Sequence, residues 1–293
     1  MKLFDVYVAH KSDFYQIRNF KCNFLGAYTS NVEVNQSLSF CFMRSGYFEY
    51  HVFHKELEVH VGRLLVSKPL NEYRIKLSKT QPDVSTIISF TPHFYDLLKE
   101  NYEGEAGWFF NNVDLKSMLI PCNAELDHLH HLIYQRSLKP FRDSILIDDW
   151  VIRLVDKVMR TVGNRPILNP IPSGLRRNHL LTIEKAKAFI IEYSGENISL
   201  QRIADHCCVS IFHFCRIFKS IMGISPYQYL NEIRLSNAQI FLSENKLPVT
   251  QIAFQCGFNS LAQFDAAFRG RFQISPTTYK KGHSSKIARI HKS

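Results

Sequence analysis

Apolar positions in the last third of the chain follow the spacing of amphipathic helices, and the same arrangement occurs twice. Residues Phe214, Phe218, Ser225, Pro226 and Tyr229 return at 264, 268, 275, 276 and 279, an offset of 50. Residues Ile203, Ala204 and Cys207 return at 252, 253 and 256, an offset of 49. The one-residue slip falls at a turn, where chains accept insertions. A repeated supersecondary unit of this length predicts a repeated fold.

Each copy predicts a helix, a short turn and a second helix. In the first copy, Ser199 and Ser210 are suited to cap the two helices, because a serine hydroxyl accepts a bond from a free backbone N–H. Gly223 suits the exit of the second helix, and Pro226 suits the first position of another. Two such helices form a helix-turn-helix, whose second helix can lie in the DNA major groove. A helical hairpin with no DNA role is the alternative, and the repetition favours DNA binding.

The two copies resemble the signature of AraC/XylS-type transcription regulators over residues 180–281. The matching residues are Ala204, Ser210, Phe218-Lys219, Gly223, Pro226, Tyr229-Leu230, Arg234-Leu235, Ala238, Ile252-Ala253, Gly257-Phe258, Phe264, Phe268, Pro276 and Tyr279. The resemblance implies two helix-turn-helix units joined by a long helix over 226–243. It also implies two recognition helices in successive major grooves on one side of the duplex, about 34 Å apart.

The first recognition helix predicts base contacts on the face opposite its apolar side chains. That face carries Phe212, Cys215, Arg216 and Lys219, flanked by Ile211 and His213. Arg216 is the best candidate for base readout, because a guanidinium can bind guanine with two hydrogen bonds. Phe212 suits a thymine methyl group, and Lys219 suits a phosphate.

The second recognition helix has a different outer face. It carries Ala262, Asp265, Ala266 and Arg269, with Asn259, Ser260 and Leu261 at its start. The family often has arginine where Ala266 stands and glycine where Gln273 stands. We therefore expect the first unit to supply most base readout. We expect the second to position the protein through four cations, Arg269, Arg271, Lys280 and Lys281. Packing of this helix without base contacts is the alternative.

The charge distribution supports this assignment. The formal net charge is +10. Residues 176–293 hold 16 Lys and Arg against 7 Asp and Glu, whereas residues 1–175 hold 20 against 19. Nearly all the basic excess therefore lies on the repeated segment, as expected of a module that binds phosphates.

The first half of the chain predicts β-structure over residues 20–90. Residues 48–52 and 57–61 alternate apolar and polar side chains around a short turn, which predicts a hairpin. Further alternation follows over 64–66, 73–77 and 84–90. Closely spaced strands predict an antiparallel barrel or sandwich. The pattern resembles the cupin-like sensor domain found ahead of the DNA-binding part in this family, so the expected fold class is α+β.

Two helices are expected after the strands, and one has a clean apolar stripe. Its residues are Ile147, Trp150, Val151, Leu154, Val155, Val158 and Met159. The stripe predicts either packing against the barrel or a dimer contact. Residues 163–178 are rich in proline and glycine, which predicts an interdomain linker. The expected domains are a sensing and dimerisation domain over 1–165, a linker over 166–178, a DNA-binding domain over 179–282 and a basic tail over 283–293.

Histidines and cysteines are the remaining candidates for chemistry. His51, His54 and His60 lie close together, but the strand alternation predicts that His51 and His60 face outward. A metal site and a cofactor are therefore not expected. Seven cysteines with no C-x-x-C pair argue against zinc and against a disulfide framework, and Cys207 and Cys256 suit core positions.

These observations predict a sequence-specific transcription regulator, by family resemblance an activator, and not an enzyme. The expected partners are double-stranded promoter DNA, RNA polymerase, a small-molecule effector and a second copy of the chain. No apolar run approaches 18 residues and no signal-peptide pattern occurs, so a cytoplasmic protein without a membrane span is expected. Three alternatives stay open: a cupin-type metal-dependent enzyme fused to a DNA-binding module, a repair regulator that transfers alkyl groups to Cys215, and a nonspecific architectural binder.

Overall fold

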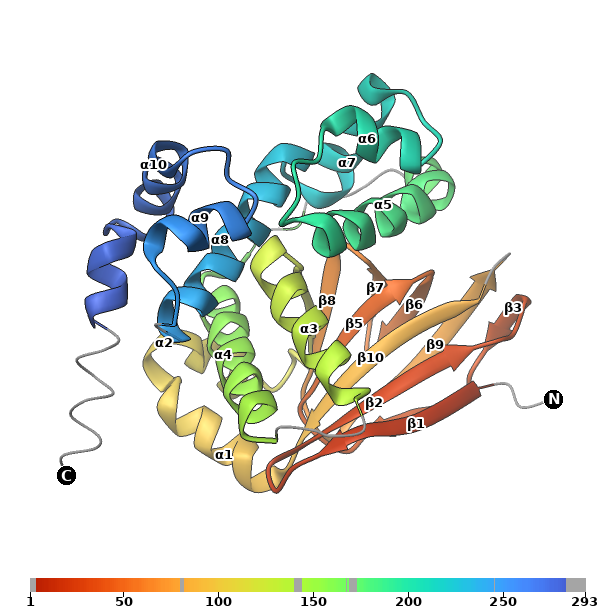
Figure 1. Cartoon of the computed structure of the whole chain (residues 1–293). Coiled ribbons are helices and arrows are strands. Elements are labelled where there is room, and N and C mark those ends of the chain that lie inside the picture. The colour runs from red at the N-terminus through yellow and green to blue at the C-terminus, as the bar shows by residue number, and fades with distance from the viewer. Residues whose placement is uncertain are drawn as a thin grey trace. The chain divides into compact units, whose positions relative to one another are not determined.

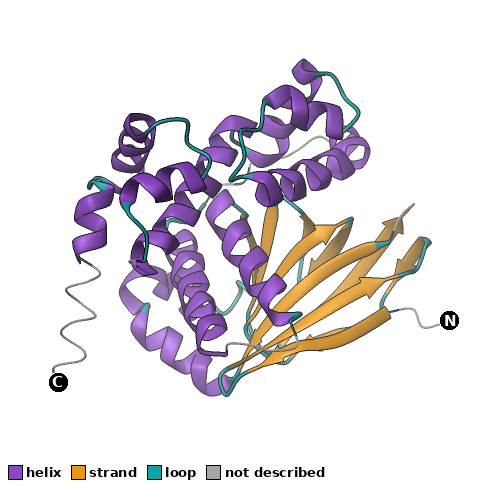
Figure 2. Ribbon diagram, viewed as in Figure 1, coloured by secondary structure: helices purple, strands orange, loops and turns teal. Residues whose placement is uncertain are grey.

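The chain folds into two compact units, Met1–Glu184 and Lys185–Ser293. The computed structural model describes residues 4–79, 82–139, 144–166, 168, 173–244 and 246–282. Strands and helices make up the first unit, and helices alone make up the described part of the second (Figure 2). The expected α+β class, with antiparallel strands first and a helical C-terminal part, is confirmed.

The described strands of the first unit form two antiparallel sheets. The larger has the order β1-β2-β10-β5-β8-β11, and the smaller has the order β3-β9-β6-β7, with β4 also paired to β9. The strands of the larger sheet are β1 Phe4–Lys11, β2 Tyr15–Cys22, β5 Ser39–Ser45, β8 Arg63–Ser67, β10 Asp83–Phe90 and β11 Ser117–Pro121. Those of the smaller sheet are β3 Gly26–Thr29, β4 Glu33–Asn35, β6 Tyr47–Val52, β7 Lys55–His60 and β9 Asn71–Lys79.

The predicted hairpin is the β6–β7 pair, in which Tyr50 faces Leu57 and Val52 faces Lys55. The two sheets are joined by side-chain contacts such as the bond from Ser67 Oγ in β8 to Tyr50 Oη in β6, at 3.2 Å. His60 corrects a sequence expectation, because it is 0% exposed rather than outward-facing. It ends β7, and its Nδ1 accepts a bond from the Gly62 amide at 3.2 Å, so the strand alternation breaks down at the turn into β8.

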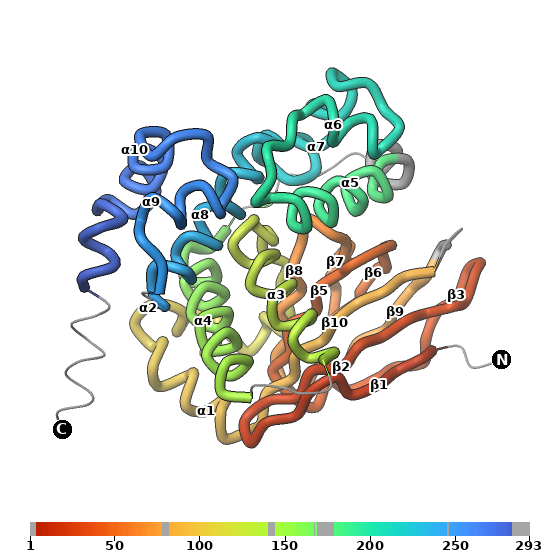
Figure 3. The backbone as a smooth tube through the Cα atoms, viewed as in Figure 1, coloured from red at the N-terminus to blue at the C-terminus, as the bar shows by residue number. Residues whose placement is uncertain are grey.

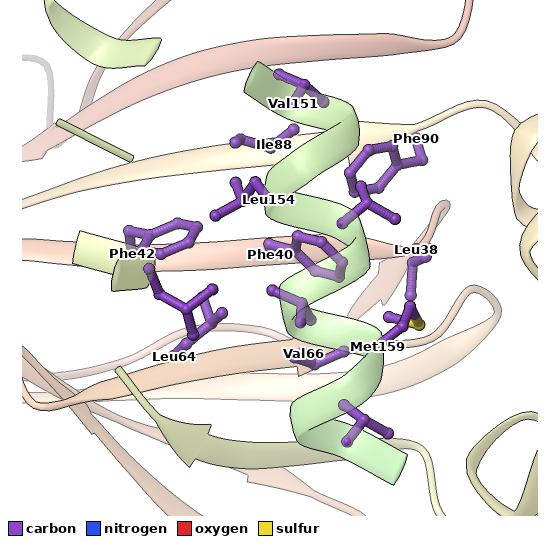
Figure 4. Close-up of a cluster of buried hydrophobic side chains, with 14 of the residues drawn as sticks. Leu38, Phe40, Phe42, Leu64, Val66, Ile88, Phe90, Val151, Leu154 and Met159 are labelled. Atoms are coloured by element: carbon purple, nitrogen blue, oxygen red, sulfur yellow. The ribbon is translucent and has the colours of Figure 1, made fainter. Parts of the chain in front are cut away.

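The apolar stripe of α4 (Ser144–Gly163) packs on the larger sheet (Figures 1 and 4). Val151, Leu154 and Met159 are buried and belong to the same core cluster as Phe40 and Ile88 of the sheet. Alternate residues of each strand point to one face, so one face of this sheet meets α4 and the other meets the smaller sheet. The packing interpretation of the stripe is therefore correct, and the dimer interpretation of these side chains is wrong, because they are already covered. A homodimer through another surface stays a prediction.

Among the described residues, three helices precede α4, more than the sequence predicted. They are α1 Pro92–Asn101, α2 Glu103–Asn111 and α3 Ala124–Ser137. Lys68 at the end of β8 holds the end of α2, where its Nζ donates to the backbone oxygens of Phe109 at 2.8 Å and Asn112 at 2.6 Å. Both carbonyl groups lie at the C-terminal end of the helix, where lysine side chains commonly bond the last carbonyl oxygens.

The predicted linker lies only partly within the described residues. Residues 167 and 169–172 are outside them, whereas residues 173–178 are helical, because α5 spans Ser173–Tyr193. The three prolines of the segment all precede Ser173, so nothing prevents the helix from starting there. The domain bounds given above, the linker included, stay predictions. The basic tail over 283–293 lies outside the described residues.

The second unit contains both copies of the repeat (Figure 3). The first copy is α6 Leu200–His206 and α7 Ile211–Met222, and the second is α9 Val249–Gln255 and α10 Leu261–Phe272. The connecting helix α8 spans Pro226–Glu244, one residue beyond the expected end. No helix in the described part of the chain is long and apolar enough to cross a bilayer.

Candidate nucleic-acid interface

Serine hydroxyls fix where both candidate recognition helices begin. Ser210 caps α7 by accepting from the His213 amide at 3.4 Å, and Ser260 caps α10 by accepting from the Gln263 amide at 3.2 Å. Both helices end on a residue in the left-handed region, Gly223 with φ +78° and Gln273 with φ +60°. The two helices therefore have matching lengths and boundaries, as the repeat predicts.

A pair of buried aromatic rings packs on the inner face of each recognition helix. Phe214 and Phe218 of α7 are fully buried, and their ring centroids are 5.6 Å apart. Phe264 and Phe268 of α10 repeat the arrangement at 5.6 Å. Because these rings fix the inner face, the opposite face of each helix is directed to the surface. Cys207 and Cys256 are buried beside the turns, as expected, and burial raises the pKa of Cys207 to about 11 and of Cys256 to about 12.

The outer face of α7 has the side chains that the sequence predicted. Phe212 is 87% exposed, an extreme value for a phenylalanine. Arg216 and Lys219 are exposed, and Ile211, His213 and Cys215 are half-buried. The guanidinium of Arg216 lies 3.3 Å from His213 Nδ1, and no carboxylate among the described residues pairs with Arg216 or Lys219. Both cations are therefore available to an anionic partner.

The outer face of α10 is different in chemistry. Asn259, Ser260, Leu261, Ala262, Ala266 and Arg269 are exposed, and Asp265 is half-buried. Arg269 Nε lies 2.7 Å from Asp265 Oδ2. The negative charge of Asp265 is therefore balanced within the helix.

The other cations expected to position the second unit also have partners within the chain. Arg271 Nε donates to Glu232 Oε2 of α8 at 2.9 Å, and Lys280 Nζ donates to the backbone oxygen of Leu247 at 2.6 Å. Lys281 is exposed. These contacts hold α10 and the segment after it onto the unit, so a phosphate role for these cations stays a prediction.

A buried arginine that the sequence analysis did not single out joins the two copies. Arg234 of α8 donates from Nε to the Ser194 oxygen at 2.9 Å and from Nη2 to the Glu196 oxygen at 2.8 Å. Its guanidinium also lies 5.9 Å from the ring centroid of Phe258, in the turn of the second copy. The resemblance had included Arg234 among the matching positions, but no local spacing reveals a contact that spans forty residues.

The first unit contains a second candidate site, a cavity of about 340 Å³ between the two sheets. Its walls are mostly apolar, and Phe4 and Val6 of the edge strand β1 line it and are partly exposed. Arg18 of β2 also lines it. The Arg18 guanidinium donates from Nη2 to Ser89 Oγ at 3.2 Å, its Nε has no hydrogen-bond partner, and no described carboxylate pairs with it.

The opposite wall of this cavity carries a tyrosine–carboxylate pair. Tyr73 Oη donates to Glu33 Oε2 at 2.8 Å. Burial raises the pKa of the Tyr73 hydroxyl, and the bond to Glu33 raises it further, so the hydroxyl keeps its proton. Among the described residues, no three His, Cys, Asp or Glu side chains are placed to hold a metal ion. No observation here favours the metal-dependent enzyme.

Comparison with known proteins identifies the second unit. A family model described as a helix-turn-helix domain matches residues 203–282. The HTH-type transcriptional activator RhaS of Escherichia fergusonii is 31% identical over 167 residues, which cover 54% of this chain and 59% of that protein. The chain carries an AraC-type helix-turn-helix domain at its C-terminal end.

Other similar proteins cover different shares of the chain. The HTH-type transcriptional regulator AlkR of Acinetobacter baylyi is 33% identical over 99 residues, 34% of this chain and 32% of that protein. The chain thus spans less than two thirds of the length of these curated relatives. The DNA-binding domain of AdpA, solved with a target DNA, is 27% identical, covers 36% of this chain and 95% of that chain, and gives a TM-score of 0.35. An apo ToxT variant from Vibrio cholerae is 13% identical, covers 91% and 96%, and gives a TM-score of 0.41.

Proposed function

We propose that the protein is a sequence-specific transcription regulator that binds double-stranded promoter DNA and activates transcription. The observation that carries this proposal is the outer face of α7, where Phe212, Arg216 and Lys219 are exposed and neither cation is held by a carboxylate. Activation, with RNA polymerase as a partner, rests on the resemblance to regulators such as RhaS, which is described as an activator.

Each side chain on this face suits a different contact in the major groove. Arg216 is suited to bind guanine O6 and N7 with two hydrogen bonds, and Phe212 is suited to contact a thymine methyl group. Lys219 lies one turn further along α7, where it suits a phosphate and fixes the position of the helix. The Arg216 contact supplies most of the discrimination, because each good two-bond pair to guanine is worth about 1–3 kcal/mol.

The second recognition helix extends the contact to a neighbouring groove. Helix α8 and the buried Arg234 connect the two copies within one unit, so their spacing is set before DNA is bound. Preorganisation of this kind raises affinity, because less freedom is lost on binding.

Selection of bound genomic fragments tests the proposal. The full chain is incubated with sheared genomic DNA, and the bound fragments are sequenced, for the wild-type protein, Arg216→Ala and Lys246→Ala. Lys246 is a matched control, because it is an exposed cation of the same unit that is already paired with Glu244 at 3.4 Å. We expect a shared motif for the wild-type protein and Lys246→Ala, with loss of a guanine position for Arg216→Ala. Recovery of fragments without any common motif would instead support the architectural binder.

We further propose that the cavity of the first unit binds a small effector, and that the effector shifts how the DNA-binding unit is presented. The cavity volume lies in the range of small-molecule sites. Its mostly apolar walls and Arg18, whose Nε has no hydrogen-bond partner, favour a carboxylic acid with an apolar body. A guanidinium binds a carboxylate with two parallel hydrogen bonds, and the unpartnered Nε supplies one of these donors.

Thermal unfolding of the full chain with paired probes tests this effector class. Decanoate and 2-naphthoate are compared with their neutral amides, which have the same apolar bodies. We expect the acids to raise the Tm and the amides to have much smaller effects, because only an anion engages Arg18. Arg18→Gln should remove the difference, whereas Arg74→Gln, an exposed arginine of β9 outside the cavity lining, should keep it. Equal shifts with acids and amides would contradict the proposed class.

A further inference from the structure

The outer face of α10 offers DNA a surface that is rich in methyl groups. Leu261 is 41% exposed, and Ala262 and Ala266 are also exposed. The charged residues of the same face, Asp265 and Arg269, pair with each other at 2.7 Å. This ion pair engages Arg269 Nε and Asp265 Oδ2 and balances the two charges within the helix.

The neighbouring polar side chains of α10 are also engaged. Gln263 Oε1 accepts from the Asn259 amide at 3.3 Å, and its Nε2 donates to Tyr227 Oη of α8 at 3.4 Å. The Ser260 hydroxyl caps the helix. The Asn259 side chain, just before α10, is exposed and remains available for a polar contact with DNA. An asparagine amide can pair with adenine in the major groove.

Comparison with α7 at the offset of 50 shows how far the two faces differ. Arg216 of α7 corresponds to Ala266 of α10, so a guanidinium is replaced by a methyl group at the same place in the repeat. Lys219 of α7 corresponds to Arg269 of α10. Lys219 has no carboxylate partner among the described residues, whereas Arg269 is paired with Asp265. The guanidinium that α7 presents to guanine thus has no counterpart at the equivalent position of α10, which is Ala266.

From this contrast we propose that α10 recognises thymine methyl groups in an A·T-rich half-site, through Leu261, Ala262 and Ala266, while α7 reads guanine. The proposal rests on the proposed function and adds the chemistry of the second half-site. The C5-methyl of thymine is the apolar group that a base pair presents in the major groove, and alanine and other apolar side chains contact it there. Burial of one methyl against such a surface changes affinity about threefold to fourfold.

Base analogues that remove one group at a time test this directly. A duplex with the selected site is made with deoxyuridine in place of thymidine, which removes only the methyl group, or with 7-deazaguanine in place of guanine, which removes only N7. The substitutions are confined to one half-site at a time, and Kd is measured by fluorescence anisotropy at fixed salt. The half-site read by α7 is assigned as the one in which Arg216→Ala no longer responds to 7-deazaguanine.

We expect deoxyuridine in the α10 half-site to weaken binding about threefold to fourfold for each contacted thymine. We expect 7-deazaguanine to matter only in the α7 half-site. Leu261→Ala should reduce the response to deoxyuridine, whereas Thr250→Ala, an exposed residue of α9 away from this face, should leave it unchanged.

Two results overturn the proposal, and they are distinguishable. Sequence-specific binding with no response to deoxyuridine in the α10 half-site, or with a response there to 7-deazaguanine, overturns the methyl readout and leaves the proposed function standing. Failure to select any common site overturns both.

Discussion

Arg234 donates from Nε to the backbone oxygen of Ser194 across 2.9 Å, and thereby ties α8 to the end of α5. Its second bond, to the Glu196 oxygen, and its position beside Phe258 extend the connection to the turn of the second copy. Only 5% of Arg234 is exposed, and burial lowers the pKa of its guanidinium. One buried cation thus joins α8, the end of α5 and the turn of the second copy.

Arg234→Met should destabilise the protein by about 2–4 kcal/mol, because two carbonyl groups lose charge-assisted hydrogen bonds in a buried place. Chemical denaturation of the full chain, followed by a probe in the second unit, measures the loss. Arg202→Met is the control, because that arginine is exposed and its ion pair with Glu196 is worth little. A denaturation midpoint for Arg234→Met equal to that of Arg202→Met would show that Arg234 does not fix the unit.

Gly257→Ala should be far more damaging than Gly223→Ala, although both glycines have positive φ, +84° and +78°. A Cβ on Gly257 would collide with the Ser194 oxygen and lie 2.9 Å from Arg234 Nε, whereas a Cβ on Gly223 meets nothing within 4 Å. Gly223→Ala should therefore cost only the conformational strain, about 1–2 kcal/mol. Gly257→Ala should cost clearly more and lower DNA affinity as well. Similar costs for the two variants, measured by denaturant titration, would exclude a tight turn at Gly257.

Gln273→Gly should stabilise the protein by about 1 kcal/mol. Gln273 ends α10 with φ +60°, a left-handed conformation that glycine adopts without steric cost. Its backbone N–H donates a hydrogen bond to the Arg269 oxygen at 2.8 Å, and this bond does not need the side chain. Thermal and chemical unfolding of Gln273→Gly and Gln273→Ala measure the effect, and only the glycine variant should gain. An equal gain in stability for Gln273→Ala would show that the left-handed backbone conformation is not the cause.

Lys68 should make stability rise with pH above about 8. Burial lowers the pKa of Lys68 from 10.5 to about 8, and the nearby Lys116 and Lys99 add to the shift. Between these values the unfolded chain binds the proton and the folded chain does not, so stability rises with pH by up to about 1.4 kcal/mol per pH unit. The gain is complete above about 10.5 and is lost as the pH falls from there to about 8. The free energy of unfolding is measured at pH 7.5, 8.5 and 9.5 for the wild-type protein and for Lys68→Met. The difference between the two proteins isolates the contribution of Lys68 from that of other titrating groups. Parallel curves for the two proteins would contradict the assignment.

The elements that sequence reasoning located correctly are those defined by local pattern. The caps Ser210 and Gly223 and the spacing of Phe214 and Phe218 are local signals, and they fixed the bounds of α7. The alternation over 48–52 and 57–61 likewise predicted β6 and β7. Strand β1 was missed, although its Phe4, Val6 and Val8 alternate with other residues.

Contacts between distant residues explain most of the rest. Nothing local shows that Glu232 engages Arg271 or that Arg234 reaches Ser194, because these partners lie about forty residues apart. The burial of His60 depends on a turn that breaks the strand alternation. The pair Asp265 and Arg269 was accessible from sequence, since residues four apart on a helix are neighbours.

The most direct test of base readout by α7 is the ratio of affinities for the selected site and for a random duplex. This ratio is measured at one salt concentration for the wild-type protein, Arg216→Ala and Lys246→Ala. If α7 reads bases through Arg216, that variant loses roughly tenfold to hundredfold of the ratio, in line with about 1–3 kcal/mol for a guanine contact. Lys246→Ala should keep the wild-type ratio. A ratio for Arg216→Ala equal to that of the wild-type protein would contradict the account.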